Sequence, residues 1–91
     1  MFYVYILQSK KDSKLYYGYT PNLRVRLKRH NNGKVNSTKY RRPFELIYYE
    51  AYKDCNIAQN RERDIKRSGK TKTNLKKRLN LNKNIQLKVP G

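Results

Sequence analysis

The sequence predicts a single α+β domain in which helices flank a three-stranded antiparallel sheet, in the order ββαβαα. The chain has 91 residues, which suits one domain of the usual ~50–250 residues. Segments rich in β-branched and aromatic residues lie at 2–9, 15–19 and 44–52, as expected for strands. The intervening segments carry helix caps and aliphatic residues at helical spacing. We expect the domain to span residues 1–80 and a polar basic tail to span 81–91.

The first two strands are expected to form a hairpin. Residues 2–9, FYVYILQS, are apolar enough for a buried strand. A polar turn over 10–14 leads to residues 15–19, LYYGY, which resume the strand pattern. Gly18 inside this second strand favours a β-bulge or a place where a ligand approaches the backbone.

A helix is expected next, over the segment NLRVRLKRHN. Thr20 and Pro21 are typical of an N-cap and a first helical position. Leu23 and Leu27 lie four apart on one face of this helix, and Asn31-Asn32-Gly33 suits its C-terminus.

The third strand is expected over residues 44–52, FELIYYEAY, after a polar basic loop over 34–43. Apolar residues occur on both faces of this strand, which favours the central position in the sheet.

Two helices are expected after the third strand. Asp54 can cap a helix over residues 55–68, and Gly69 is expected to end it. A shorter helix is expected over 73–80, with Thr73 as its cap. The residues expected to face the sheet are Ile57, Ala58, Ile65, Leu75 and Leu79.

The charge of the chain points to a polyanionic partner. Twenty-three Lys and Arg face six Asp and Glu, which gives a net charge of +17, and the cations occur in both halves. Nucleic acid is the usual partner of a small cationic domain. A generic anion binder and a membrane-surface protein are the alternatives, but no long basic amphipathic helix supports the latter.

Several classes of protein are excluded by what the sequence lacks. No run approaches the ~18–20 apolar residues of a membrane span, and the first residues do not form a signal peptide. We therefore expect a cytoplasmic protein with no membrane contact. A single cysteine, Cys55, excludes a disulfide framework and a cysteine-based zinc site, and a single histidine, His30, excludes a metal cage built from imidazoles. Cys55 is expected to be a small buried residue.

Five residues form a candidate catalytic set. Arg26 and His30 lie four apart on the first helix. Each follows a core leucine by three residues, so both lie beside the buried stripe. An ordinary basic helix face would give the same pattern.

Glu62 is the candidate carboxylate. It lies four residues after Ala58 and three before Ile65, at the margin of the apolar stripe of its helix. It can form an ion pair with Lys66, four residues on. Alternatively it can bind Mg2+, which needs only one or two protein carboxylates besides water and phosphate.

The remaining candidates are Tyr5 and Tyr16, in the paired strands of the first hairpin. The nine tyrosines of the chain can stack on bases, complete the core or transfer protons. A phenol of pKa near 10 becomes a useful base only where cations or a metal lower that value. A carboxylate, a guanidinium, an imidazole and two phenols together suit phosphodiester hydrolysis.

Over residues 2–80 the chain resembles the GIY-YIG nuclease family, most of all its small single-domain bacterial members. The two signature motifs correspond to Tyr3-Val4-Tyr5 and Tyr16-Tyr17-Gly18. The segments NLRVRLKRHN, KYRRPFELIYYE and AQNRERDIK match the later motifs in order. Two departures stand out: Tyr3 replaces the glycine that opens the first motif, and the late asparagine of the family corresponds to either Asn80 or Asn82.

The resemblance implies a hydrolytic DNA endonuclease that uses one metal ion, Mg2+ or Mn2+. Tyr5 and Tyr16 would flank the attacking water, and one of them, with His30, would relay its proton. Arg26 would stabilise the charge on the phosphate, and Glu62 would hold the metal. Branched, nicked or single-stranded DNA is the expected substrate, as in repair and recombination, and the protein is expected to act as a monomer.

An alternative is a nucleic-acid-binding module that keeps the fold with slow or absent catalysis. It is favoured by the high charge and the altered first motif, whereas a binding module has no use for Glu62 beside phosphate. In either case, the residues expected to contact phosphates are Lys28, Arg29, Lys39, Arg41, Arg42 and Lys66.

Overall fold

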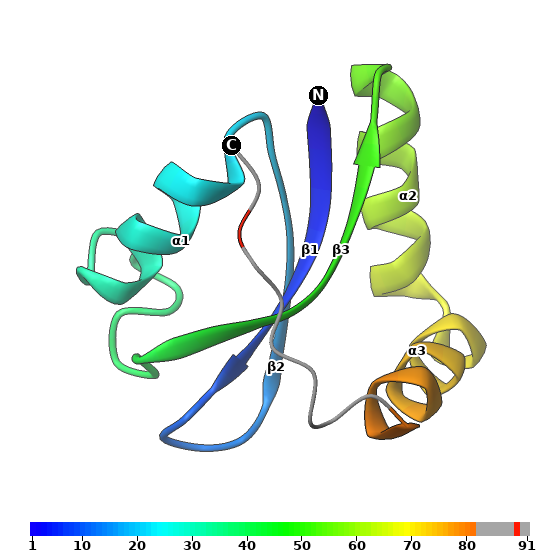
Figure 1. Cartoon of the computed structure of the whole chain (residues 1–91). Coiled ribbons are helices and arrows are strands. Elements are labelled where there is room, and N and C mark those ends of the chain that lie inside the picture. Colours follow the sequence, from blue (N-terminus) through cyan, green and yellow to red (C-terminus); the bar gives the residue numbers. More distant parts are fainter. Residues whose placement is uncertain (82–88, 90–91) are drawn as a thin grey trace.

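The computed structural model describes residues 1–81 and residue 89. It contains six elements in the predicted order ββαβαα (Figure 1). These are β1 (Phe2–Ser9), β2 (Leu15–Thr20), α1 (Leu23–Asn31), β3 (Phe44–Tyr52), α2 (Cys55–Arg67) and α3 (Gly69–Leu81). The predicted α+β class and its antiparallel three-stranded sheet are therefore confirmed. Within the described residues, no helix is long and apolar enough to cross a membrane.

The strands lie in the order β2-β1-β3, so β1 is central. The prediction that residues 44–52 form the central strand was wrong. The fully covered strand is β1, whose residues 4–7 are buried on both faces. β3 instead lies at an edge of the sheet. Two of its tyrosines, Tyr48 and Tyr52, donate hydrogen bonds to the carboxylate of Glu50.

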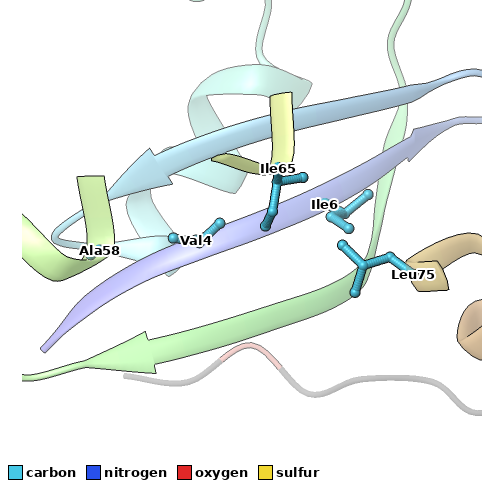
Figure 2. Packing of buried hydrophobic residues seen from close by; sticks show 5 residues of the cluster. All are labelled: Val4, Ile6, Ala58, Ile65 and Leu75. Atoms are coloured by element: carbon cyan, nitrogen blue, oxygen red, sulfur yellow. The ribbon is translucent and has the colours of Figure 1, made fainter. Parts of the chain in front are cut away.

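Helices cover both faces of the sheet (Figure 1). On one face Val4 and Ile6 of β1 pack against α2 and α3, through Ala58, Ile65 and Leu75 (Figure 2). On the other face, α1 and β3 complete a second cluster, which consists of Tyr5, Leu7, Leu23, Phe44 and Leu46. Because strand side chains alternate between faces, successive residues of β1 pack into the two clusters in turn. The burial of Ala58, Ile65 and Leu75 confirms three of the five predicted core positions on α2 and α3.

The start of α1 differs from the prediction by two residues. The N-cap is Asn22, whose side chain accepts a hydrogen bond from the Val25 amide at 3.2 Å. Thr20 lies two residues earlier, where its hydroxyl accepts a hydrogen bond from the Asn22 amide at 3.1 Å. At the other end, Gly33 has a φ of +74°, a conformation that glycine adopts without steric cost, and the predicted stop at residues 31–33 is confirmed.

The boundary between α2 and α3 also differs from the prediction. Asp54 caps α2 as expected, with its carboxylate accepting from two amides. Gly69 begins α3 rather than only ending α2, because the Ser68 hydroxyl accepts from the Thr71 amide at 3.1 Å and so supports the first turn. Thr73 lies within α3 and donates to the Gly69 carbonyl instead of capping.

Ile57 is 54% exposed and does not join the core. The side chain of Leu79, the fifth predicted core residue, and the predicted tail from residue 82 lie outside what the structure describes, apart from Val89.

Candidate active site

Tyr5 is a fully buried tyrosine on the central strand, directly opposite Gly18 of β2. A Cβ at Gly18 would lie 2.4 Å from both the hydroxyl oxygen and the Cζ of Tyr5. Glycine is therefore required here because the Tyr5 ring lies across the backbone of β2. The predicted bulge at Gly18 was wrong, because the register between β1 and β2 is continuous there. The irregularity occurs between β1 and β3, at Ile6 and Leu7, and the group that lies against Gly18 is the Tyr5 side chain.

His30 joins Tyr5 from the last turn of α1. Its side chain is fully buried, and its Nε2 lies 3.0 Å from the Tyr5 hydroxyl. Its Nδ1 lies 2.8 Å from the hydroxyl of Thr38. Burial, assisted by the positive charge of Arg26, lowers the pKa of His30 to about 4. The imidazole is therefore neutral near pH 7, with one ring nitrogen donating and the other accepting.

The hydrogen-bond partners indicate which nitrogen carries the proton. The Thr38 hydroxyl can donate to the Val35 carbonyl, at 3.4 Å, and it then accepts from Nδ1–H of His30. Nε2 is then free of hydrogen and accepts from the Tyr5 hydroxyl. That hydroxyl in turn lies 3.5 Å from Nε of Arg26, at the outer limit of a hydrogen bond. We call this row of donors, from Arg26 through Tyr5 and His30 to Thr38, the donor chain.

The ionisation of Tyr5 fits its place in the donor chain. Burial raises the pKa of Tyr5 to about 12, although the hydrogen bond from Arg26 opposes the shift. The phenol therefore holds its proton near neutral pH and donates it toward His30. The same contact raises the pKa of Arg26, so its guanidinium remains charged throughout.

Tyr16 completes the group on this face of the sheet. Its ring centroid lies 5.0 Å from that of His30 and 6.3 Å from that of Tyr5, and its side chain is half-buried. The structure thus brings together four of the five predicted catalytic residues, namely Tyr5, Tyr16, Arg26 and His30.

Glu62 approaches from α2, which packs against β1 and β2. Its carboxylate forms an ion pair with Lys66 at 3.5 Å, one of the two alternatives that the sequence left open. Its negative charge also contributes to the raised pKa of Tyr5, so the two side chains lie within electrostatic reach of one another.

The fit of a metal ion to these residues depends on the metal. The described residues contain no group of three or more His, Cys, Asp or Glu that could enclose an ion. A single half-buried carboxylate suits Mg2+, which keeps several waters and takes further oxygens from a substrate phosphate. A hydrated Mg2+ or Mn2+ completed by substrate is the kind of ion that such a donor set could hold, and Glu62 is the carboxylate available for it.

The six predicted phosphate-binding residues fall into two groups. Lys28, Arg29 and Arg42 are exposed. The other three have partners within the protein: Lys39 lies over the Tyr40 ring, Arg41 pairs with Asp12 at 2.8 Å, and Lys66 pairs with Glu62.

Thr38 is the site residue that sequence reasoning missed. It is fully buried, yet it lies in a polar loop eight residues after His30. A threonine among Asn, Ser and Lys carries no periodic signal, so only the path of the loop reveals its contact with the imidazole. Asn82 lies outside the described residues, as does the side chain of Asn80.

Cys55 is half-buried at the start of α2, with its Sγ 3.0 Å from the Tyr19 hydroxyl. Cys55 is therefore less buried than predicted, and its contact with Tyr19 is separate from the cluster around Tyr5.

Comparison with known proteins agrees with this geometry. The GIY-YIG catalytic domain matches residues 1–76, and the chain belongs to the GIY-YIG family. This membership supports a nuclease-type hydrolase as the general class, with DNA as its substrate.

Small relatives in other bacteria share most of the chain. A UPF0213 protein of Clostridium perfringens is 47% identical over 68 residues, covering 74% of this chain and 72% of the relative. A UPF0213 protein of Staphylococcus haemolyticus is 46% identical over 65 residues, covering 70% and 78%. The solution NMR structure of a UPF0213 protein from Bacillus halodurans shares 37% identity and a TM-score of 0.52, covering 82% of each chain.

Proposed function

We propose that this protein is a divalent-metal-dependent endonuclease that hydrolyses phosphodiester bonds in DNA. The observation that carries the proposal is the donor chain: a buried neutral imidazole hydrogen-bonded to a phenol that lies beside a guanidinium. A binding surface needs the cations only. A buried proton acceptor linked to a phenol is a device for moving a proton.

In this proposal the proton of the attacking water leaves through Tyr5 and His30. The Tyr5 oxygen takes the proton from water while its own proton passes to Nε2 of His30, so the phenol never carries a full charge. This coupling is needed because the pKa of Tyr5, about 12, makes a free phenolate costly. The imidazolium formed has a pKa of about 4, so it returns its proton readily to the Tyr5 oxygen, which passes a proton on to the departing group or to solvent.

Arg26 and Glu62 supply the electrostatic part of the mechanism. The guanidinium of Arg26 would stabilise the negative charge that develops on the phosphate oxygens. Glu62 would hold one Mg2+ or Mn2+, which when bound supplies positive charge for the phosphodiester and its leaving oxygen. Tyr16, whose ring lies beside those of Tyr5 and His30, would orient the water. In the alternative assignment Tyr16 takes the proton from water and Tyr5 orients it.

The biological setting follows from the chemistry of the substrate. A small cationic domain makes most of its contacts with phosphates, which carry no sequence information, so we propose branched, nicked or single-stranded DNA as substrate, in repair or recombination. We further propose that it acts in the cytoplasm as a monomer, with residues 1–80 as its catalytic unit.

The second candidate is a DNA-binding module with slow or absent catalysis. It is favoured by the ion pair between Glu62 and Lys66 and by Tyr3 in place of the motif glycine. A nuclease should cleave DNA and a binding module should cleave it slowly or not at all, whereas both should bind DNA.

A magnesium-titrated cleavage assay on duplex, nicked, flapped and four-way DNA separates the two. The informative pair of variants is Arg26→Ala and Arg63→Ala, because each removes one positive charge and Arg63 is an exposed residue of α2. For the nuclease, Arg26→Ala lowers the rate by about 100–1,000-fold, while Arg63→Ala cleaves like the parent. Absence of cleavage by the parent on every substrate would favour the binding module.

A further inference from the structure

Tyr40 is an aromatic residue that the protein leaves largely exposed to solvent. Its side chain is 76% exposed, more than any other large hydrophobic residue in the described part of the chain. A tyrosine ring normally keeps its apolar body packed and only its hydroxyl in water. A ring held outward in this way is available to a partner.

The backbone beneath Tyr40 is fixed on both sides, so the exposed ring is held in place. Thr38, two residues earlier, is buried against His30, and the Arg41 amide donates to the Thr38 carbonyl at 2.9 Å to close a turn. The Arg41 carbonyl accepts from the Ser9 hydroxyl, and its guanidinium pairs with Asp12. Tyr40 therefore lies at the tip of an anchored turn.

The charge around the ring favours a polyanion. The ammonium of Lys39 lies 4.9 Å from the centre of the Tyr40 ring, and Lys11 donates to the Tyr40 carbonyl at 3.1 Å. A flat aromatic face beside ammonium groups is the arrangement that binds single-stranded nucleic acid, because the bases stack and the phosphates meet the cations.

The position of the turn relates Tyr40 to the candidate active site. Its Cα is at most about 7 Å from that of Thr38, since consecutive Cα atoms are about 3.8 Å apart. Thr38 touches His30 directly. The turn that carries Tyr40 thus adjoins the buried end of the donor chain, and a strand bound at Arg26 would need to extend only a short way along the protein to reach it.

We propose that Tyr40 is a stacking platform for an unpaired nucleobase of the DNA strand that enters the site. In a continuous duplex each base is already stacked and paired, and it offers the ring no free face. A flap, a gap or a single strand does offer one. This inference rests on the proposed function for the identity of the polymer, and it selects substrates with unpaired nucleotides close to the cleaved bond.

Binding in EDTA tests the stacking without requiring catalysis. Fluorescence anisotropy at a fixed salt concentration would compare a single-stranded oligonucleotide with a blunt duplex of the same length. Stacking is worth about 1–3 kcal/mol per base, so Tyr40→Ala should weaken single-strand binding by about 5–150-fold. Duplex affinity should stay within about twofold, and Tyr40→Phe should bind like the parent because it keeps the ring.

Two controls separate stacking from charge and from loss of exposed apolar surface. Lys39→Ala should weaken the binding of both the single strand and the duplex. It should also reduce the salt dependence of affinity by about one phosphate contact. Ile57→Ala removes another exposed apolar side chain and should change neither affinity.

Equal loss for single strand and duplex, no loss for either, or the same loss for Tyr40→Phe as for Tyr40→Ala would overturn the inference. So would the absence of DNA binding by the parent. A selective loss in Tyr40→Ala together with no cleavage by the parent would leave the stacking platform standing and contradict the nuclease.

Discussion

The hydroxyl of Tyr5 on β1 lies 3.0 Å from Nε2 of His30 on α1, although 25 residues separate them in the sequence. Both side chains are fully buried, so their hydrogen bond is shielded from bulk solvent. Thr38 holds the opposite nitrogen of the ring at 2.8 Å. The orientation of the imidazole is thus determined from both sides before any substrate binds.

Thr38→Val should test whether the second contact matters for the site. Valine keeps the shape of threonine but leaves the buried Nδ1–H of His30 without an acceptor, which costs about 1–3 kcal/mol in unfolding free energy. We expect cleavage to fall by about tenfold or more as the ring loses its fixed orientation, and the pH–rate profile to shift. Thr38→Ser, which retains the hydroxyl, should recover both the stability and the profile. A Thr38→Val protein with the parent's profile would show that the contact is structural alone.

Stability should decline in acid because His30 is buried in its neutral form. Its folded pKa of about 4 lies below the ordinary value of 6.5, so between these values the unfolded state binds more protons. Unfolding free energy therefore falls as the pH drops from about 6.5 to about 4, by at most about 3 kcal/mol. Urea unfolding across this range, compared with His30→Gln, should show a shallower slope in the variant. Parallel slopes would contradict a neutral buried imidazole.

Gly18→Ala should displace Tyr5. The added methyl group would lie 2.4 Å from the Tyr5 hydroxyl and ring, and overpacking of this kind costs about 1–3 kcal/mol. Cleavage should fall with it because the Tyr5 hydroxyl leaves His30. Gly69→Ala is the matched control, since a methyl group added at Gly69 would have no neighbour within 4 Å and the residue is remote from Tyr5. Thermal unfolding and cleavage of both variants would check this, and equal behaviour of the two would refute the close packing.

Glu50 is expected to stabilise the folded protein and to take no part in cleavage. Burial alone would raise its pKa, but hydrogen bonds from Arg61, Tyr48 and Tyr52 lower it to about 2. Glu50→Gln should reduce unfolding free energy by about 1–3 kcal/mol, the usual worth of charge-assisted hydrogen bonds. Urea unfolding would measure this loss. The folded variant should cleave DNA at the parent's rate, and a selective loss of cleavage would bring Glu50 into the site.

The elements of the fold were predictable because their signals are local. The runs of β-branched and aromatic residues, the Asp54 cap and the glycine at position 33 each act within a few residues. The order of the strands was not predictable from the sequence of β3. In the sequence its tyrosines count as apolar residues that need cover on both faces, whereas the hydroxyls of Tyr48 and Tyr52 bind Glu50. That arrangement depends on Arg61 of α2, which is distant in sequence.

The candidate site was predictable in its residue types and less so in its chemistry. Helical spacing places Arg26 and His30 on one face, and the structure confirms their proximity to Tyr5. Sequence alone does not give the pKa values of Tyr5 and His30, since these follow from burial between β1, β2 and α1. Thr38 was missed for the same reason, because its role comes from the path of the loop.

The central claim is that Glu62 supports a metal-dependent cleavage at this site, and one pair of variants tests it most directly. Glu62→Ala and Glu45→Ala each remove one negative charge, but Glu45 is an exposed residue of β3. With circular dichroism showing both to be folded, cleavage of flapped DNA would be measured across a Mg2+ titration, and DNA binding would be measured in EDTA. We predict that Glu62→Ala loses cleavage at every Mg2+ concentration while its binding stays equal or tightens, and that Glu45→Ala cleaves like the parent. Normal cleavage by folded Glu62→Ala would reduce Glu62 to the partner of Lys66, an ion pair worth about 0.3–0.5 kcal/mol, and would contradict the mechanism.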